Sequence, residues 1–284
     1  MSAHLGLIRS RDLNPKRSLS QNFLVHEQHL DFVLAAAELT DLDTVLEIGP
    51  GLGVLTKRLA EQAGRVVAVE LDDRLFEILG ETFAETPNVE LVHGDILELD
   101  PVELVTAGGT RRGDDGLYKV VANLPYNITS VVLRQLLEAS QSPTRLVVMV
   151  QKEVAERICA EPGQLSILAV SVQFYAHPSI VHIVPADAFY PKPKVDSAVL
   201  RLDVFPEKPL PHIDAERFFC DCARRLQPEA QATAQQLERG SASAQTPDRG
   251  SAPPGWHRPA ASRPDLVVGR MGPAGSGCGI SVTS

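Results

Sequence analysis

The sequence predicts an α/β fold with a doubly wound, mostly parallel sheet and late antiparallel additions. In the first 205 residues, apolar segments with the character of strands alternate with segments that have the period of a helix. Several apolar segments end in glycine or an acid, and ligands bind at the carboxyl ends of strands in open α/β sheets. A hydrophobic fraction of 44% in 284 residues is sufficient for a sizeable core.

Helices are expected where apolar residues recur at helical spacing, and strands where apolar residues run together between turn residues. The expected order is a helix at 30–39, a strand at 43–49, a helix at 53–62, a strand at 65–72, a helix at 73–85, a strand at 89–97, a loop at 106–116, a strand entering 118–126, a helix at 130–139 and a strand at 145–151. The further apolar segments 165–176, 179–185 and 197–205 complete the pattern and supply the antiparallel additions.

A glycine-rich turn joins the first predicted strand to a helix. The sequence EIGPGLG places Gly49, Gly51 and Gly53 at alternate positions, and glycine allows a tight turn and close approach of a ligand to the backbone. Alone this is a weak signal, because an ordinary strand-to-helix turn has the same composition. Here Glu47 adds a carboxyl group at the head of the turn.

Two acids end the next two predicted strands. Glu70 follows the turn by about 20 residues, where an acid in nucleoside-binding folds accepts hydrogen bonds from ribose hydroxyls. Asp95 ends the third strand, where a carboxylate can receive an adenine amino group. Taken alone, Asp95 is better interpreted as a turn or helix cap. The ordered set of glycine, Glu70 and Asp95 predicts a nucleoside site more strongly than any one residue does.

The sequence NLPYNI, residues 123–128, ends the fourth predicted strand. Proline fixes its own backbone and lacks an N–H donor, so Pro125 does not suit the interior of a sheet. The segment is either a simple turn or a device that holds the Asn123 amide, a carbonyl and the Tyr126 ring in place for chemistry.

The glycine turn, the two acids and Asn-Leu-Pro-Tyr, in this order, resemble S-adenosylmethionine-dependent methyltransferases that modify exocyclic amino groups. The segments SQNFL (20–24), QKEVAERI (151–158) and FYPKPKVDSAVLRL (189–202) narrow the resemblance to the ribosomal RNA adenine N6,N6-dimethyltransferase family of the KsgA type, which acts near the 3′ end of small-subunit rRNA. The resemblance covers about residues 14–219 and implies a Rossmann-like methyltransferase domain.

The resemblance implies roles for individual residues. In the cofactor site it implies that Glu70 binds the ribose and Asp95 the adenine of S-adenosylmethionine, with further contacts from Asn22, Leu24, Glu47, Gly49, Gly51 and Asn123. In catalysis it implies an Asn123-Leu124-Pro125-Tyr126 motif and an aromatic, Phe189, that packs against the target base.

The chemistry of adenine N6 explains these residue types. Its lone pair is delocalised into the ring, which makes it a poor nucleophile. The side-chain oxygen of Asn123 and the carbonyl of Leu124 can accept from the amino group, hold it in line with the methyl donor and stabilise the developing positive charge. Tyr126 can stack on a base turned out of the RNA, with Phe189 on its other side. No strong general base is needed, because methylation makes N6 acidic enough to lose a proton to water.

The composition sets expectations for partners and location. The net charge of −9 disfavours broad nucleic-acid binding, although residues 1–20 hold four basic residues and one acid. The four cysteines and eight histidines have no zinc or disulfide spacing, so no metal is expected. The chain has no apolar run of membrane-spanning length and no apolar segment of a secretory signal near its start, so we expect a cytoplasmic protein without membrane association. We also expect it to act as a monomer.

The composition changes after Phe219. Residues 220–240 contain three basic and three acidic residues, where the family has a small basic helical domain, and 241–284 lack periodicity, which predicts a disordered tail. Reading the codons one nucleotide later permits AIVRAGFSPKRKQLRNSLSAG, which resembles the missing basic segment. We therefore hypothesise a frameshift near codon 220, which the nucleotide sequence would test. The alternative is an unrelated natural tail.

The expected organisation is a methyltransferase domain at 1–205, a remnant or replacement of the helical domain at 206–240, and the tail at 241–284. The expected function is dimethylation of adenine N6 in small-subunit rRNA within an assembling ribosomal subunit, with RNA binding weakened by the altered C-terminus. The alternatives are a methyltransferase acting on large-subunit rRNA and an RNA-binding assembly factor with little turnover. A DNA adenine methyltransferase is disfavoured, because such enzymes commonly have Asp at the position of Asn123.

Overall fold

The computed structural model describes residues 15, 21–107, 117–207, 218–219 and 222. The chain divides into two compact units, Met1–Asp214 and Ala215–Ser284. The described residues of the second unit are helical. Apart from Pro15 and Cys222, the basic N-terminal segment 1–20, the segment with the proposed frameshift and the tail 241–284 lie outside the described residues. The domain boundaries and the frameshift therefore stay predictions.

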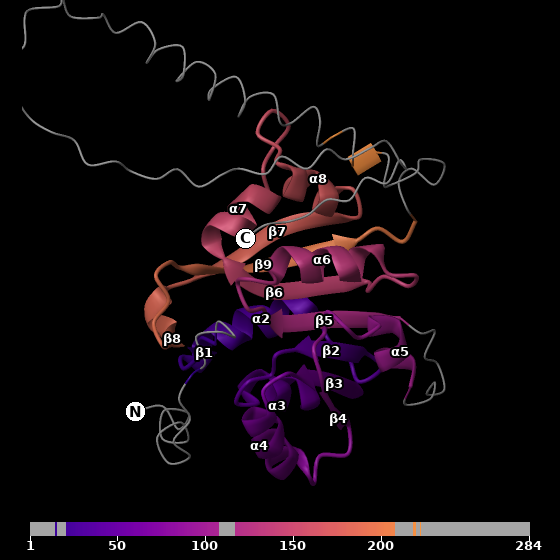
Figure 1. Ribbon diagram of the computed structural model, residues 1–284, viewed down its shortest axis with the longest axis vertical. Coiled ribbons are helices and arrows are strands. Elements are labelled where there is room, and N and C mark those ends of the chain that lie inside the picture. The colour runs from indigo at the N-terminus through magenta and orange to yellow at the C-terminus, as the bar shows by residue number, and fades with distance from the viewer. Residues whose placement is uncertain (1–14, 16–20, 108–116, 208–217, 220–221, 223–284) are drawn as a thin grey trace, which may run out of the picture. The chain divides into compact units, whose positions relative to one another are not determined.

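A seven-stranded sheet, in the order β4-β3-β2-β5-β6-β9-β7, forms the centre of the first unit (Figure 1). Its parallel part consists of β2 (Thr44–Ile48), β3 (Arg65–Glu70), β4 (Val89–His93), β5 (Tyr118–Asn123) and β6 (Arg145–Gln151). The later strands β9 (Ser197–Val204) and β7 (Ala176–Val184) are added antiparallel to β6 and to each other. The predicted mostly parallel sheet with late antiparallel additions is confirmed.

Helices connect these strands. The four predicted helices are α2 (Leu30–Ala37), α3 (Val54–Ala60), α4 (Asp73–Phe83) and α6 (Thr129–Glu138), and the chain adds α5 (Pro101–Thr106), α7 (Lys152–Ile158), α8 (Ile167–Gln173) and the 3-10 turns η2 (Glu27–His29) and η3 (Ala186–Ala188). Side-chain caps start several of them, because the Asp72, Asp100 and Ser166 oxygens accept from backbone N–H groups that have no partner inside the helix.

A second, two-stranded sheet was not predicted. It pairs β1 (Phe23–Leu24) antiparallel with β8 (Phe189–Tyr190), and Val25 N donates to the Ala188 carbonyl at 2.8 Å beside it. Two-residue strands have no periodic pattern, which is why the sequence alone did not indicate them. This sheet brings the segment before α2 to the segment before β9.

One face of the large sheet carries both polar regions discussed below. Side chains alternate along a strand, so Lys119, Val121 and Asn123 share a face of β5. Val121 belongs to a core cluster that includes residues of α2 and α3, for example Val33 and Leu59. Lys119 therefore lies at the amino end of this face, and Asn123 lies at its carboxyl end.

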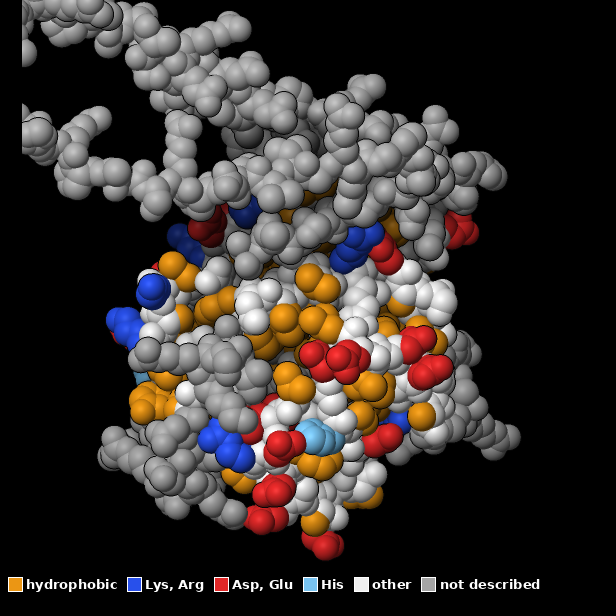
Figure 2. Space-filling view, viewed as in Figure 1, with side chains coloured by type: hydrophobic (Ala, Val, Ile, Leu, Met, Phe, Trp, Pro, Cys, Tyr) orange, Lys and Arg blue, Asp and Glu red, His pale blue; other side chains and the backbone are white. Residues whose placement is uncertain are grey.

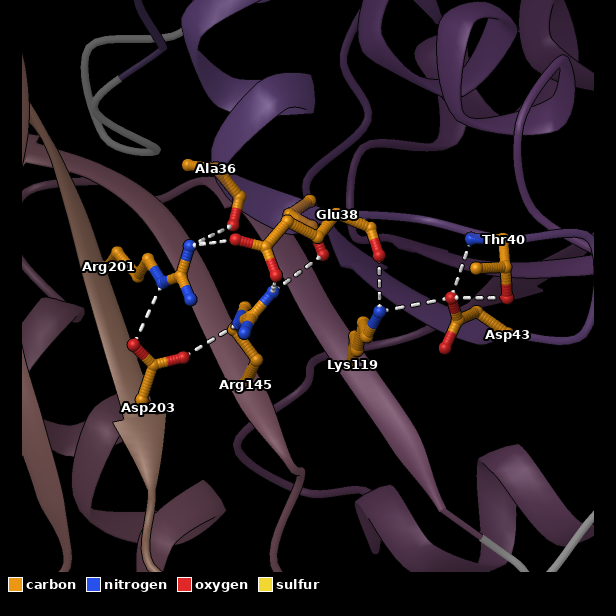
Figure 3. Close-up of polar contacts among 9 residues, drawn as sticks. Ala36, Glu38, Thr40, Asp43, Lys119, Arg145, Arg201 and Asp203 are labelled. Carbon is orange, nitrogen blue, oxygen red and sulfur yellow. Dashed lines mark hydrogen bonds and ion pairs between the residues drawn. The ribbon is translucent and has the colours of Figure 1, made fainter.

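An ion-pair network fastens the C-terminus of α2 to the sheet edge formed by the amino ends of the parallel strands and the carboxyl end of the antiparallel strand β9 (Figure 3). Glu38, with a left-handed φ of 48°, accepts from Arg145 Nη1 at 2.8 Å and from Arg201 Nη1 at 2.6 Å, and its carbonyl accepts from Lys119 Nζ at 2.7 Å. Asp203 accepts from both arginines at 2.7 and 2.8 Å. We call this group the amino-edge network: Glu38, Asp43, Lys119, Arg145, Arg201 and Asp203.

Candidate active site

A pocket of about 290 Å³ lies at the carboxyl ends of β2, β3 and β5. The polar residues that line it are Gln21, Asn22, Glu47, Glu70, Asp95, Asn123, Tyr126 and Asn127. Among the described residues that line it, none is Lys, Arg or His. The face shown in Figure 2 has acidic side chains spread over its lower half among apolar ones.

The glycine turn forms one wall of the pocket and requires glycine for two different reasons. Gly49 and Gly53 have left-handed φ values of 67° and 77°. A Cβ on Gly53 would lie 2.7 Å from Cε2 of Phe83, whereas a Cβ on Gly49 would meet no heavy atom within 4 Å. Gly53 therefore allows close packing inside the protein, and Gly49 leaves open space beside the backbone in the pocket wall.

Glu70 holds the turn and the start of the next segment together. Its Oε2 accepts from Gly51 N at 3.1 Å, and its Oε1 accepts from Leu71 N at 3.0 Å and from Asp72 N at 2.9 Å. Burial raises the pKa of Glu70 even though these three hydrogen bonds favour the ionised form. A carboxylate has about four acceptor sites, so Glu70 keeps one for a ligand.

Glu47 also lines the pocket but has a different environment. It is 1% exposed, and its Oε2 has no hydrogen-bond partner among the described residues. Burial raises the pKa of Glu47 to about 8, the Thr56 hydroxyl opposes this shift, and the charge of Glu70 adds to it. The Thr56 hydroxyl is likewise buried without a hydrogen-bond partner among the described residues, so burial leaves two costly polar groups at this point of the fold.

Asp95 combines the two roles that the sequence left open. One of its oxygens, Oδ1, accepts from Leu97 N at 2.9 Å and so closes the turn after β4. Asp95 is half-buried and lines the pocket. The turn cap uses one oxygen and leaves the other for a ligand.

The segment NLPY is held rigidly at the end of β5. Leu124 N donates to the Met149 carbonyl at 3.2 Å, and the Pro125 carbonyl accepts from Ile128 N and from the Thr129 hydroxyl, each at 3.2 Å. The Tyr126 hydroxyl lies 2.8 Å from the Ser197 hydroxyl, which is fully buried. The segment therefore turns the chain into α6 and also fixes its own polar groups.

Residues 21–24, which we call the N-terminal strap, line the pocket. The Asn22 carbonyl accepts from Nδ2 of Asn123 at 3.2 Å, and Gln21 Nε2 donates to Oδ2 of Asp72 at 3.1 Å. Phe23 packs in an apolar cluster with residues of the glycine turn and α4. The strap thus joins the glycine turn, the start of α4 and Asn123 into one structure.

The structure brings all but one of the predicted site residues together around the pocket. The residues that line it are Asn22, Leu24, Glu47, Gly49, Gly51, Glu70, Asp95, Asn123, Leu124, Pro125 and Tyr126. The exception is Phe189, which is 3% exposed and packs in the core with Leu24. Stacking of Phe189 on a base stays a prediction, and it requires the ring to leave this core.

Sequence reasoning did not identify three residues that position the site. Gln21 and Asp72 hold the strap, and Ser197 holds Tyr126. Gln21 lies in SQNFL and Ser197 in FYPKPKVDSAVLRL, two segments that carry the family resemblance. The resemblance therefore covered both residues, but it assigned neither of them a role in the site. Asp72 resembles an ordinary helix cap in the sequence, and only its contact with Gln21 shows the second role.

The described residues contain no group of three or more His, Cys, Asp or Glu side chains placed to hold a metal ion. In the same part of the chain, no helix is both long enough and apolar enough to cross a membrane.

Comparisons with known sequences give a consistent result. The profile of the family described as "Ribosomal RNA adenine dimethylase" matches residues 12–239. The chain is 51% identical over 190 residues to "Ribosomal RNA small subunit methyltransferase A" of Dehalococcoides mccartyi (strain CBDB1), which covers 67% of this chain and 63% of that relative. It is 47% identical over 219 residues to the protein of the same name from Moorella thermoacetica, covering 76% and 75%. The match therefore spans less than two thirds of the first relative.

Comparisons with solved structures agree on the fold. A 23S rRNA methyltransferase, ErmE, superposes with a TM-score of 0.57 at 32% identity and covers 66% of this chain and 71% of ErmE. A dimethyladenosine transferase from Plasmodium falciparum superposes with a TM-score of 0.56 at 28% identity, covering 65% and 64%.

Proposed function

The chain belongs to the ribosomal RNA adenine dimethylase family, and from this premise we propose that it transfers methyl groups from S-adenosylmethionine to adenine N6 in small-subunit ribosomal RNA. The observation that carries the proposal is the pocket that brings Glu70, Asp95 and Asn123 together at one edge of the sheet. The names of the D. mccartyi and M. thermoacetica relatives support the small-subunit substrate. We place the activity in the cytoplasm, on assembling subunits, with the protein acting as a monomer.

The residues of the pocket fit S-adenosylmethionine. The free acceptor site of Glu70 suits a ribose hydroxyl, and the second oxygen of Asp95 suits an adenine amino group. The open space at Gly49 suits the methionine part. When bound, the cofactor supplies an electrophilic methyl group.

Asn123 prepares the adenine amino group for reaction. Because its Nδ2 donates to the Asn22 carbonyl, its Oδ1 is the atom left to accept from N6. This oxygen and the Leu124 carbonyl draw the amino hydrogens toward the protein, which aims the nitrogen lone pair and stabilises the positive charge that develops on N6. The extra proton then leaves to water.

Tyr126 supplies a surface for the base. Its hydroxyl is tied to Ser197, so the ring cannot swing freely. A ring with a fixed orientation can stack on an adenine that has left its RNA helix, at a small entropic cost.

The proposal is tested by transfer of labelled methyl groups from S-adenosylmethionine to unmethylated small ribosomal subunits. Nucleotide mapping is expected to find dimethylated adenines near the 3′ end of the rRNA. Binding of S-adenosylmethionine without transfer to any ribosomal substrate would contradict the proposed activity.

The likeness to ErmE favours one other candidate, methylation of large-subunit rRNA. The same assay with unmethylated large subunits distinguishes the two, since the proposed function predicts labelling of the small subunit only. An assembly factor with little turnover is the other alternative, and it predicts that replacing Asn123 leaves the protein's role in ribosome assembly unchanged.

A further inference from the structure

A glutamine of α6, Gln135, clamps the chain segment that follows β4. Its Nε2 donates to the Ile96 carbonyl and to the Leu99 carbonyl, each at 2.9 Å. Both partners are carbonyl oxygens, so the orientation of the amide is fixed and both of its N–H groups are used. The other polar atom of the amide, Oε1, is buried and has no hydrogen-bond partner among the described residues. Burial of this oxygen is costly, so the two hydrogen bonds of Nε2 are what favours glutamine at this position.

The clamped segment forms one wall of the pocket. Gly94, Asp95 and Ile96 line the pocket, and Ile96 is buried. The side chain of Leu99 packs on Gly94, because a Cβ on Gly94 would lie 3.0 Å from Cδ1 of Leu99. Clamping the Leu99 carbonyl therefore also holds the Leu99 side chain against the backbone of the pocket wall.

Local hydrogen bonds shape this segment but do not connect it to the helices around it. Asp95 Oδ1 accepts from Leu97 N at 2.9 Å, and the Asp95 carbonyl accepts from Glu98 N at 2.9 Å. The side chains of Leu97 and Glu98 are exposed, so they do not anchor the segment in the core. Gln135 supplies the connection, because its two acceptors lie 39 and 36 residues before it in the chain.

The same helix also starts at the segment NLPYNI. Ile128 lines the pocket, and the hydroxyl of Thr129, the first residue of α6, donates to the Pro125 carbonyl at 3.2 Å. Gln135 lies almost two turns further along α6. Through Gln135, α6 therefore joins the wall that contains Asp95 to the segment that contains Asn123 and Tyr126.

We propose that Gln135 is a positioning residue for the adenine subsite of the cofactor pocket. Its clamp fixes the segment of Asp95, so that the second carboxylate oxygen of Asp95 accepts from the 6-amino group and the pocket selects a 6-aminopurine. This inference rests on the proposed function, in which Asp95 binds the adenine of the cofactor. Gln135 itself does not line the pocket, so it acts through the clamped segment and not by contact with the ligand.

The test is titration calorimetry with two ligands that differ only at the base. One is S-adenosylhomocysteine, the product left after methyl transfer, and the other is its analogue with a purine that lacks the 6-amino group. We expect the native chain to bind S-adenosylhomocysteine about 10-fold more tightly than the analogue, the scale of one hydrogen bond to a carboxylate. In Gln135→Met, which has a similar volume but no donor, S-adenosylhomocysteine should bind about 5–10-fold more weakly, whereas the analogue should bind within about 2-fold of native.

The chain contains a matched control in a second glutamine clamp. Gln173 of α8 donates through Nε2 to the Ile158 carbonyl at 2.7 Å and to the Ala160 carbonyl at 2.9 Å, and none of these three residues lines the pocket. Gln173→Met therefore loses the same two kinds of hydrogen bond elsewhere in the fold. We expect it to lower the melting temperature as Gln135→Met does but to keep both affinities within about 2-fold of native.

A double-mutant cycle tests whether Gln135 acts through Asp95. In the Asp95→Ala background the acceptor for the amino group is absent, so Gln135→Met should weaken S-adenosylhomocysteine binding by less than about 2-fold further. Gln135→Asn is a milder variant in case Gln135→Met does not fold. Its amide is one methylene shorter and is drawn away from both carbonyls, and we expect a smaller loss that again affects S-adenosylhomocysteine and spares the analogue.

The possible results separate the inference from the proposed function. Equal losses for the two ligands in the Gln135 variants, or the same loss in Gln173→Met, overturn the inference and leave the proposed function standing. An undiminished effect of Gln135→Met in the Asp95→Ala background also overturns it. Failure of the folded native chain to bind either S-adenosylmethionine or S-adenosylhomocysteine refutes the proposed function and the inference together.

Discussion

The two ends of one sheet face use charged residues in opposite ways. At the amino end, the amino-edge network pairs each carboxylate with Lys or Arg at hydrogen-bonding distance. At the carboxyl end, the pocket has three carboxyl groups and no basic residue among its described lining. On β5 alone, Lys119 and Asn123 are four residues apart on the same face and belong to these two regions.

The pKa values show the same contrast in a single type of side chain. Hydrogen bonds from Arg201 and Arg145 hold the pKa of Glu38 below its usual value, whereas burial raises the pKa of Glu47 to about 8. A paired carboxylate stabilises the fold, whereas burial of an unpaired one costs stability. The difference teaches that pairing with a cation, rather than the presence of carboxyl groups as such, distinguishes the two ends of this sheet face.

The largest expected effect is a loss of methyl transfer in Asn123→Ala with little loss of thermal stability. Asn123→Ala removes the side-chain acceptor for N6, so we expect methyl transfer to fall about 10²–10³-fold, the usual cost of losing one positioned group at a developing charge. The melting temperature should stay within about 2 °C of native, because Asn123 makes one hydrogen bond to the strap. Methyl transfer to small subunits and thermal unfolding are the measurements. A loss of rate explained by unfolding would contradict the assignment.

The next comparison is made within the glycine turn. Gly53→Ala places a Cβ against Phe83 in a left-handed conformation, so we expect a loss of about 2–4 kcal/mol of stability. Gly49→Ala has the same backbone strain without the clash and should cost about 1 kcal/mol, but its methyl group narrows the pocket and should weaken S-adenosylmethionine binding more. Urea unfolding and titration calorimetry give both quantities. Equal effects on stability would show that the packing against Phe83 is unimportant.

A smaller effect is expected at the amino-edge network. Arg145→Met removes charge-assisted hydrogen bonds to Glu38 and Asp203, but both carboxylates are exposed to solvent, so we expect the melting temperature to fall by only about 2–4 °C. The rate per folded molecule should not change. Altered affinity for S-adenosylmethionine would show that the two ends of the sheet are coupled.

The loss of stability expected for Arg145→Met should depend on pH, because Asp203 of the amino-edge network titrates in acid. Burial opposes ionisation of Asp203, but hydrogen bonds from Arg201 and Arg145 outweigh it and lower its pKa. A carboxyl group with a lowered pKa contributes stability above its unfolded pKa, about 4, and loses that contribution as the pH falls through the folded value. The native chain and Arg145→Met should therefore converge in stability in acid.

The smallest expected effect is a gain in stability, whereas the glycine and arginine substitutions above are expected to lower it. Glu47 has a raised pKa, so between its unfolded value near 4.5 and about pH 8 the folded protein holds a proton that the unfolded chain releases, and stability falls as the pH rises. Glu47→Gln should therefore be slightly more stable than native at pH 8, by about 2–4 °C for roughly 1 kcal/mol. Thermal unfolding in the absence of ligand measures this. A lower melting temperature for the variant would show that Glu47 supports the fold.

Several features could be predicted from the sequence because they are local. The glycine turn, Glu70, Asp95 and NLPY each end a strand whose apolar pattern is visible, and parallel strands place such ends at one edge. Gln21 and Asp72 could not be assigned to the site in this way. Their contact joins residues 51 positions apart, and no periodic pattern connects them.

The sequence by itself determined the class of the fold and the strand-end residues of the pocket, because strand periodicity and strand-end residues are properties of short segments, and the family resemblance added Asn22 and Leu24. Only the tertiary structure decided which groups meet. The Asn123 amide finds the Asn22 carbonyl 101 residues away, and Phe189 enters the core beside Leu24. Tertiary packing also left one oxygen of Glu47 buried without a partner. Burial and hydrogen-bond pairing depend on every neighbouring segment at once, so no single segment of the sequence could reveal them.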